Sequence, residues 1–146
     1  MIRYVLPSDI KQLVVLCEEH AQYEKAKFIN QNNASKLKQA LFSKPSKLSC
    51  LVVENNDQLV GYATFMIQFS TWDAKEYFYL DCLYLRKEYR GQGIGADLMQ
   101  KVKDIALGQN CSSIQWQTPL FNKRAVQFYQ RLGAESKEKI RFFWEL

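Results

Sequence analysis

The sequence has few of the residues that bind metals and none of the long apolar runs that cross membranes. It contains one histidine, His20, and four cysteines that stand singly without a Cys-x-x-Cys pair, so we predict buried free thiols and no metal site. No apolar run approaches the ~20 residues that a membrane helix needs, and residues 1–4 lack the pattern of a secretory signal. We therefore expect a cytoplasmic protein that does not bind membranes.

The charge of the chain is modest and dispersed. The formal net charge is +5, and basic residues form local runs only at 36–47 and 137–141. A protein that binds nucleic acid more often shows a clustered basic stripe, so no nucleic-acid partner is expected, whereas a mild positive field suits a polyanionic cofactor. The 146 residues, with an ordinary balance of 47% apolar and 24% charged residues, predict one domain over residues 1–146.

One stretch, residues 77–107, organises the chain. The apolar run 77–85 predicts a buried strand, and apolar residues near helical spacing from Ile94 onward predict an amphipathic helix. Between them stands the loop Arg90-Gly91-Gln92-Gly93-Ile94-Gly95. Its three glycines let the backbone turn sharply and present bare N–H groups at a helix start, where the helix dipole favours an anion. We interpret the loop as a pyrophosphate-binding site.

Other phosphate-binding patterns fit this loop less well. The P-loop pattern fails because no Lys-Ser or Lys-Thr pair follows the glycines, and the dinucleotide pattern G-x-G-x-x-G fails on spacing. The remaining alternative is a tight turn that only joins a strand to a helix. An arginine with three glycines is more than such a turn needs.

The order of elements predicts an α/β (α+β) fold with a mixed sheet and helices on both faces. Apolar patterns indicate strands over 2–6, 50–54, 58–69, 77–85, 112–117 and 140–146. Helical patterns begin near residues 10, 32, 94 and 121. Gly61 within a strand predicts either a bulge or the close approach of another backbone.

The glycine loop resembles the acetyl-coenzyme A loop of the GCN5-related N-acetyltransferases (GNAT). The family pattern Gln/Arg-x-x-Gly-x-Gly/Ala matches Arg90, Gly93 and Gly95. The element order is also that of the GNAT acyl-CoA N-acyltransferase fold, with its mixed, mostly antiparallel sheet. Further segments look like the diamine (spermidine/spermine) N-acetyltransferase branch, namely 19–24, Ser70-Thr71-Trp72, Tyr79-Leu80-Asp81, 122–125 and 128–134.

The resemblance implies acetyl-CoA as the cosubstrate. Main-chain groups of Leu83, Tyr84 and Leu85 would hold its pantetheine arm, and Asn122 would contact or orient that arm or simply cap a helix. The residues implied to hold the pyrophosphate are Arg90, Gly91, Gln92, Gly93, Ile94, Gly95 and Ala96.

The resemblance also implies two catalytic residues. Tyr129 would be the general acid that protonates the departing thiolate, and Asp81, where the branch carries Glu, would help to remove a proton from the amine. Tyr129 is otherwise a core aromatic of its helix. Asp81 inside an apolar strand costs free energy unless it is paired or faces a cleft, which favours a functional role.

The residues that we expect to contact the acceptor amine are Glu19, Tyr23, Trp72 and Asp81. Glutamates of the first helix otherwise form a solvated acidic face, and Trp72 otherwise packs in a hairpin loop. The predicted function is acetyl transfer to a primary amine of a small cationic acceptor (polyamine, diamine or lysine-like), without a covalent enzyme intermediate. The alternatives are a non-catalytic acyl-CoA sensor and an enzyme that acts on a protein or peptide amine. The resemblance also implies a homodimer, in which the aromatic run 141–146 packs across the two chains; the alternative is an ordinary edge strand.

Overall fold

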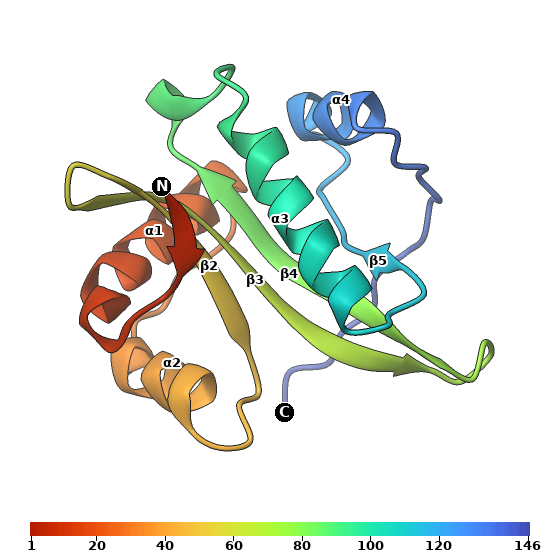
Figure 1. Ribbon diagram of the computed structural model, residues 1–146, viewed down its shortest axis with the longest axis horizontal. Coiled ribbons are helices and arrows are strands. Elements are labelled where there is room, and N and C mark those ends of the chain that lie inside the picture. The colour runs from red at the N-terminus through yellow and green to blue at the C-terminus, as the bar shows by residue number, and fades with distance from the viewer.

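A five-stranded sheet forms the centre of the computed structural model, which describes residues 1–146 (Figure 1). The strands lie in chain order and are β1 (Ile2–Tyr4), β2 (Ser49–Asn55), β3 (Gln58–Ser70), β4 (Lys75–Leu85) and β5 (Ile114–Gln115). The first four pair antiparallel, and β5 pairs parallel to β4. The prediction of a mixed, mostly antiparallel sheet is confirmed.

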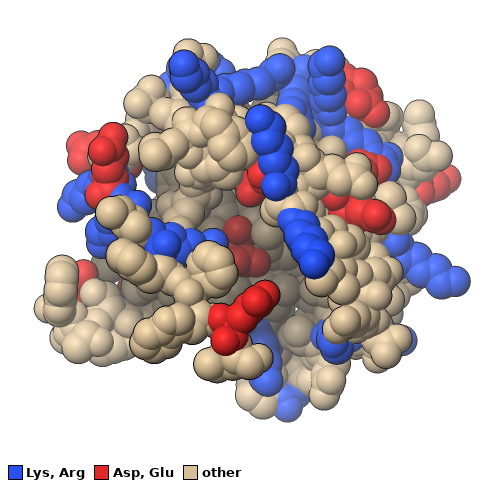
Figure 2. Space-filling model, turned by 180° about the vertical axis from the view of Figure 1, so that it is seen from behind, with Lys and Arg blue, Asp and Glu red and all other residues tan.

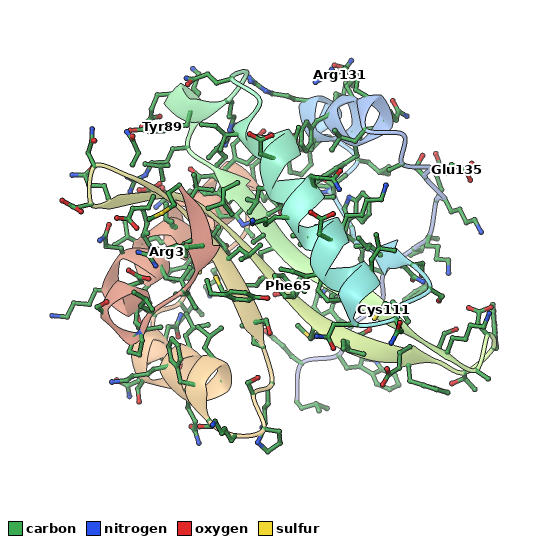
Figure 3. All side chains as sticks on the ribbon, viewed as in Figure 1. Arg3, Phe65, Tyr89, Cys111, Arg131 and Glu135 are labelled. Atoms are coloured by element: carbon green, nitrogen blue, oxygen red, sulfur yellow. The ribbon has the colours of Figure 1, made fainter.

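Helices cover both faces of this sheet. In Figure 1, α3 lies across the front of the sheet. Alternate side chains of β2 serve the two faces, since Leu51 and Val53 pack in a cluster with residues of α3, whereas Cys50 and Val52 pack with those of α1 and α2. Phe65 belongs to the cluster under α3 (Figure 3). The helices are α1 (Ile10–Tyr23), α2 (Asn33–Phe42), α3 (Ile94–Gly108) and α4 (Lys123–Arg131).

The helices and cysteines can be compared with what the sequence predicted about membrane spans and disulfides. The longest helix, α3, has 15 residues, and none of the helices has the length and apolarity needed to cross a membrane. All four cysteines are free thiols, although only Cys50 is fully buried.

A bulge in β4 marks the point beyond which the outer edge of this strand is left unpaired. Thr64 of β3 faces Cys82, and Phe65 faces Leu80, so that Asp81 has no partner residue. Such an extra residue bends its strand and re-aims its side chain. β5 pairs only with Phe78 and Tyr79, before the bulge. Beyond the bulge, therefore, no strand pairs with the outer edge of β4.

The prediction of a last strand over 140–146 is wrong. The chain after α4 forms no regular secondary structure, and its large apolar side chains are exposed, from 81% at Ile140 to 118% at Leu146. An apolar run becomes a strand only where another strand offers an open edge of matching length. The strand at that edge of the sheet, β5, has only two residues, so within one chain it offers little for the segment to pair with.

Gly61 lies beside a bulge and is also closely approached by another backbone, which are the two alternatives that its position in the sequence predicted. The register jumps beside it, since Val53 faces Gly61 but Glu54 faces Leu59, which marks a bulge at Val60. A β-carbon built on Gly61 would lie 2.7 Å from the carbonyl oxygen of Tyr84, a main-chain atom that cannot move aside easily.

Replacing Gly61 with alanine is expected to lower the free energy of unfolding by about 1–3 kcal/mol, because it overpacks the contact between β3 and β4. Urea denaturation measures the change. Gly108→Ala, at the end of α3 with open space around the added methyl group, is the matched control and should be neutral or slightly stabilising. Equal effects of the two substitutions would contradict the close approach.

Candidate active site

A cavity of about 750 Å³ lies between α1, β4, the glycine loop and α4, within the size range of small-molecule sites. Figure 2, which views the face away from α3, shows a hollow with acidic side chains inside it and basic side chains around it. The segment after α4 also reaches the cavity through Lys139 and Arg141.

The glycine loop forms one end of the cavity. Gly91 and Gly93 have φ of +79° and +86°, which side chains rarely adopt, while a β-carbon on Gly95 would lie 3.3 Å from the ring of Phe128. The loop therefore needs two of its glycines for conformation and the third for packing against α4. Helix α3 begins at Ile94, and the first N–H groups of a helix have no acceptor inside it. Gly91, Gly93, Gly95 and Ala96 line the cavity, whereas Gln92 and Ile94 do not.

The open edge of β4 forms the floor beside this loop. Leu83, Tyr84 and Leu85 all line the cavity. Arg90 folds back over the same strand, where its Nε donates to the carbonyl oxygen of Leu85 at 2.6 Å. Its guanidinium lies 4.3 Å from the ring centre of Tyr23 and 5.5 Å from that of Tyr84. The charge of Arg90 is thus held inside the site, between β4 and α1.

Asp81 and Tyr129, from different elements, line the same cavity. Asp81 projects from the bulge of β4, and the thiol of Cys82 lies 3.6 Å from its Oδ2. Tyr129 of α4 packs edge-on against Trp116, with ring centres 5.0 Å apart. Burial raises the pKa of Tyr129, and the nearby Glu24 raises it further. The phenol is therefore protonated at neutral pH and can donate.

Asn122 links α4 to α1 across the cavity. Its side-chain oxygen accepts from the main-chain N–H of Ala125 at 3.2 Å, which caps α4, and from the hydroxyl of Tyr23 at 3.2 Å. Helix capping, one of the two roles that the sequence suggested for Asn122, is thus present in the structure. Asn122 and Tyr23 both line the cavity.

Two of the expected acceptor contacts lie elsewhere. Both carboxylate oxygens of Glu19 bind Arg86, at 2.8 and 2.9 Å, and Glu19 does not line the cavity. Trp72 lies in the turn between β3 and β4, is 96% exposed and does not line the cavity either.

Two residues that we had not assigned to the site do line the cavity. His20 and Glu24 both come from the first helical segment and face inward. Their spacing of four residues places them on one side of a helix. This spacing is the sequence feature from which their shared position could have been predicted. The structure brings no group of three or more His, Cys, Asp or Glu side chains close enough to hold a metal ion.

Comparison with known proteins identifies the family. The sequence model of the acetyltransferase (GNAT) family matches residues 9–134. The chain belongs to this family. A thialysine N-epsilon-acetyltransferase of Bos taurus is 33% identical over 143 residues, which cover 92% of this chain and 84% of the relative. The chain is therefore an N-acetyltransferase of the GNAT type.

The resemblance to the diamine branch is also confirmed. A spermidine/spermine N(1)-acetyltransferase-like protein 1 of Homo sapiens is 26% identical over 140 residues, which cover 91% of this chain and 20% of that longer protein. Among solved structures, an integron cassette protein from V. cholerae is 28% identical, with a TM-score of 0.75 over 99% of this chain and 92% of the other. This structural likeness and the match to the family model together confirm the GNAT fold.

Replacing Asn122 with alanine is expected to lower the free energy of unfolding by about 1 kcal/mol, because the cap of α4 is lost. Asn122→Asp retains an oxygen that can accept from Ala125 and is the matched control. Urea denaturation of the two variants measures the difference. If Asn122→Ala were as stable as the wild type, the hydrogen bond to Ala125 would not hold α4 in place.

Proposed function

We propose that the enzyme transfers an acetyl group from acetyl-CoA directly to a primary amine of a small cationic acceptor, either a diamine or polyamine or a lysine-like molecule. The observation that carries the proposal is the meeting of Asp81, Tyr129 and the glycine loop in one cavity. These groups come from β4, α4 and the start of α3, so no single element would bring them together.

The residues at the loop end fit the chemistry of coenzyme A. The free N–H groups at the start of α3 suit a pyrophosphate, and Arg124 and Arg131 of α4 line the same cavity and add positive charge. The open edge of β4 can bond the amides of a pantetheine arm as an added strand would. The proposed cofactor contacts are the main chain of 83–85 and, among residues 90–96 and beyond, those that line the cavity, namely Arg90, Gly91, Gly93, Gly95, Ala96 and Asn122.

The acetyl transfer needs two proton movements, and the site has a group for each. An ammonium has no lone pair, so it must lose a proton before it attacks the thioester that acetyl-CoA supplies. Asp81 would accept that proton, directly or through a water. Tyr129, which keeps its proton at neutral pH, would donate to the departing thiolate. A main-chain N–H of β4 would stabilise the oxyanion.

The state of the cysteine in the cavity favours direct attack of the amine on the thioester over a mechanism with an acyl-enzyme intermediate. Cys82 is the thiol that lines the cavity, and burial, together with the charge of Asp81, raises its pKa to about 12. The nucleophilic form of cysteine is the thiolate, which is scarce at neutral pH when the pKa is this high. Cys82 is therefore poorly suited to carry the acetyl group.

The charges that line the cavity favour a lysine-like amine. Asp81 and Tyr23 are the proposed acceptor contacts, because Glu19 is paired with Arg86 and Trp72 lies outside the cavity. Lys139 and Arg141 also line the cavity and can hold a carboxylate of the acceptor, which a polyamine lacks.

Tyr129→Phe and Asp81→Asn are each expected to lower kcat about 100-fold or more, since each removes a proton-transfer group. Thiol release from acetyl-CoA, with diamines, spermidine, spermine, lysine analogues and a short peptide as acceptors, is the measurement. Asp104→Asn removes an exposed carboxylate of α3 and should leave the rate unchanged.

The same panel separates the alternative functions. Binding of coenzyme A without thiol release from any acceptor would point to a sensor. Release with the peptide alone would point to a protein or peptide amine.

We also propose that the enzyme is a homodimer in which residues 140–146 of each chain pack against a second copy. Five large apolar side chains of this segment are exposed, namely Ile140, Phe142, Phe143, Trp144 and Leu146. Exposed apolar side chains gathered in one segment in this way are typical of a protein contact in soluble proteins. The segment also extends from the cavity wall at Lys139 and Arg141, so a second copy would cover the site's rim.

Light scattering is expected to give a mass near twice the 17.1 kDa of one chain. The double substitution Phe142→Asp and Phe143→Asp should shift the mass toward one chain, because two charges would then enter an apolar contact. Leu120→Asp, at an equally exposed apolar residue outside the segment, is the control and should leave the mass unchanged. A wild-type mass near 17.1 kDa at high concentration would refute the dimer.

A further inference from the structure

The side chain of Arg90 begins in the glycine loop but makes its contacts with β4 and α1. Its Nε donates to the carbonyl oxygen of Leu85 at 2.6 Å. Its guanidinium carbon lies 4.3 Å from the ring centre of Tyr23 and 5.5 Å from that of Tyr84. A guanidinium can donate along its edge and stack on an aromatic ring with its face at the same time. Arg90 therefore joins the end of α1 to the strand that forms the cavity floor.

Tyr23 is the residue of α1 that this contact restrains. It is the last residue of the helix and is 40% exposed, and an exposed side chain ordinarily changes rotamer freely. Two contacts fix it here, because its ring carries the guanidinium of Arg90 and its hydroxyl donates to Oδ1 of Asn122 at 3.2 Å. The same oxygen accepts from the main-chain N–H of Ala125, so Tyr23 holds the residue that caps α4.

Helix α4 has few other contacts that could set its position. None of its residues is buried. Its aromatic contacts are those of Phe128 with Gly95 and of Tyr129 with Trp116. Among the hydrogen bonds of the structure, only the one from Tyr23 joins α4 or its cap to another helix or strand. The place of this helix therefore depends strongly on Tyr23.

Tyr129 is placed to feel a shift at the start of α4. It follows Asn122 by seven residues, which is about two turns of an α-helix, so both side chains lie on one side of α4. Both line the cavity. A general acid must lie within hydrogen-bonding reach of the atom that it protonates, and a misplacement of about 1 Å can cost a large factor in rate.

We propose that Arg90 is a positioning residue for Tyr129, the proposed general acid. It acts through Tyr23, whose hydroxyl holds the start of α4. Arg90 would adjoin the cosubstrate as part of the loop, while its charge serves α1 and does not pair with the diphosphate. The main-chain N–H groups at the start of α3 and the arginines of α4 would hold that diphosphate. The proposal rests on the proposed acetyl transfer.

Arg90→Gln separates the two uses of the charge, since glutamine keeps a donor for the carbonyl of Leu85 but has no cation to place on Tyr23. Its affinity for coenzyme A, measured by calorimetry, should equal that of the wild type, and kcat should fall about 10-fold or more. Loss of a charge that paired with the diphosphate would instead weaken coenzyme A binding about 10-fold or more. Lys87→Gln removes an exposed positive charge nearby and should change neither quantity.

A double-mutant cycle tests the route through Tyr129. If Arg90 acts by placing the phenol, Arg90→Gln should lower kcat in the wild type but cause no further loss in Tyr129→Phe. A residue that only supports the fold would lower kcat by the same factor in both backgrounds.

Tyr23→Phe provides a second variant that tests the same route. It keeps the ring that carries the guanidinium and removes only the hydroxyl that bonds Asn122. With saturating acceptor it should lower kcat, bind coenzyme A as the wild type does, and cause no further loss in Tyr129→Phe. This cycle decides the question if Arg90→Gln does not fold.

The outcomes distinguish the positioning role from the function on which it rests. A wild type that acetylates no amine refutes the proposed function. In an active wild type, coenzyme A binding that weakens about 10-fold or more in Arg90→Gln overturns the positioning role. So does a kcat that is unchanged in Arg90→Gln or Tyr23→Phe, or that falls equally with and without the hydroxyl of Tyr129.

Discussion

The separation of β4 from β5 is the constraint on which the active site depends. The two strands pair at only two residues, Phe78 and Tyr79, and the bulge at Asp81 then turns β4 away. Because of that divergence, the outer edge of β4 at 83–85 pairs with no strand and lines a cavity, and a carboxylate projects into it without an ion pair. Straight pairing along both strands would leave no open main-chain edge and would give Asp81 no reason to face the cavity.

Helix α1 supplies the opposite wall, and polar contacts fix its position. The pair of Glu19 with Arg86 joins it to the end of β4, and Tyr23 joins it to Asn122 at the start of α4. Partly exposed ion pairs contribute at most about 1 kcal/mol to stability. The pair of Glu19 with Arg86 therefore matters chiefly for position, because it joins α1, which carries His20 on the cavity wall, to the end of β4.

Sequence patterns were sufficient for features that depend on neighbouring residues. The glycine loop was found because strand, turn and helix follow one another, and the positive φ of Gly91 and Gly93 is what glycine permits. The choice among the glutamates of the first helix depended instead on contacts far along the chain. Glu19 has its partner 67 residues away, and only that pairing shows why it lies outside the cavity. The run 140–146 was apolar enough for a strand, but the pattern could not supply the edge that a strand needs.

In the proposed reaction the cavity would hold a polyanion and a cation at once, and it is lined by charges of both signs. Asp81 and Glu24 lie on β4 and the first helical segment, whereas Arg124 and Arg131 lie on α4 beside the glycine loop. Arg90 lies between these two groups of charges, because it is part of the loop after β4 and its guanidinium stacks on Tyr23 of α1. Aromatic faces attract a cation without neutralising it. Arg90 is thus held by the rings of Tyr23 and Tyr84 and by the carbonyl of Leu85 and not by a carboxylate, which leaves Asp81 without an ion pair and available to the proposed ammonium.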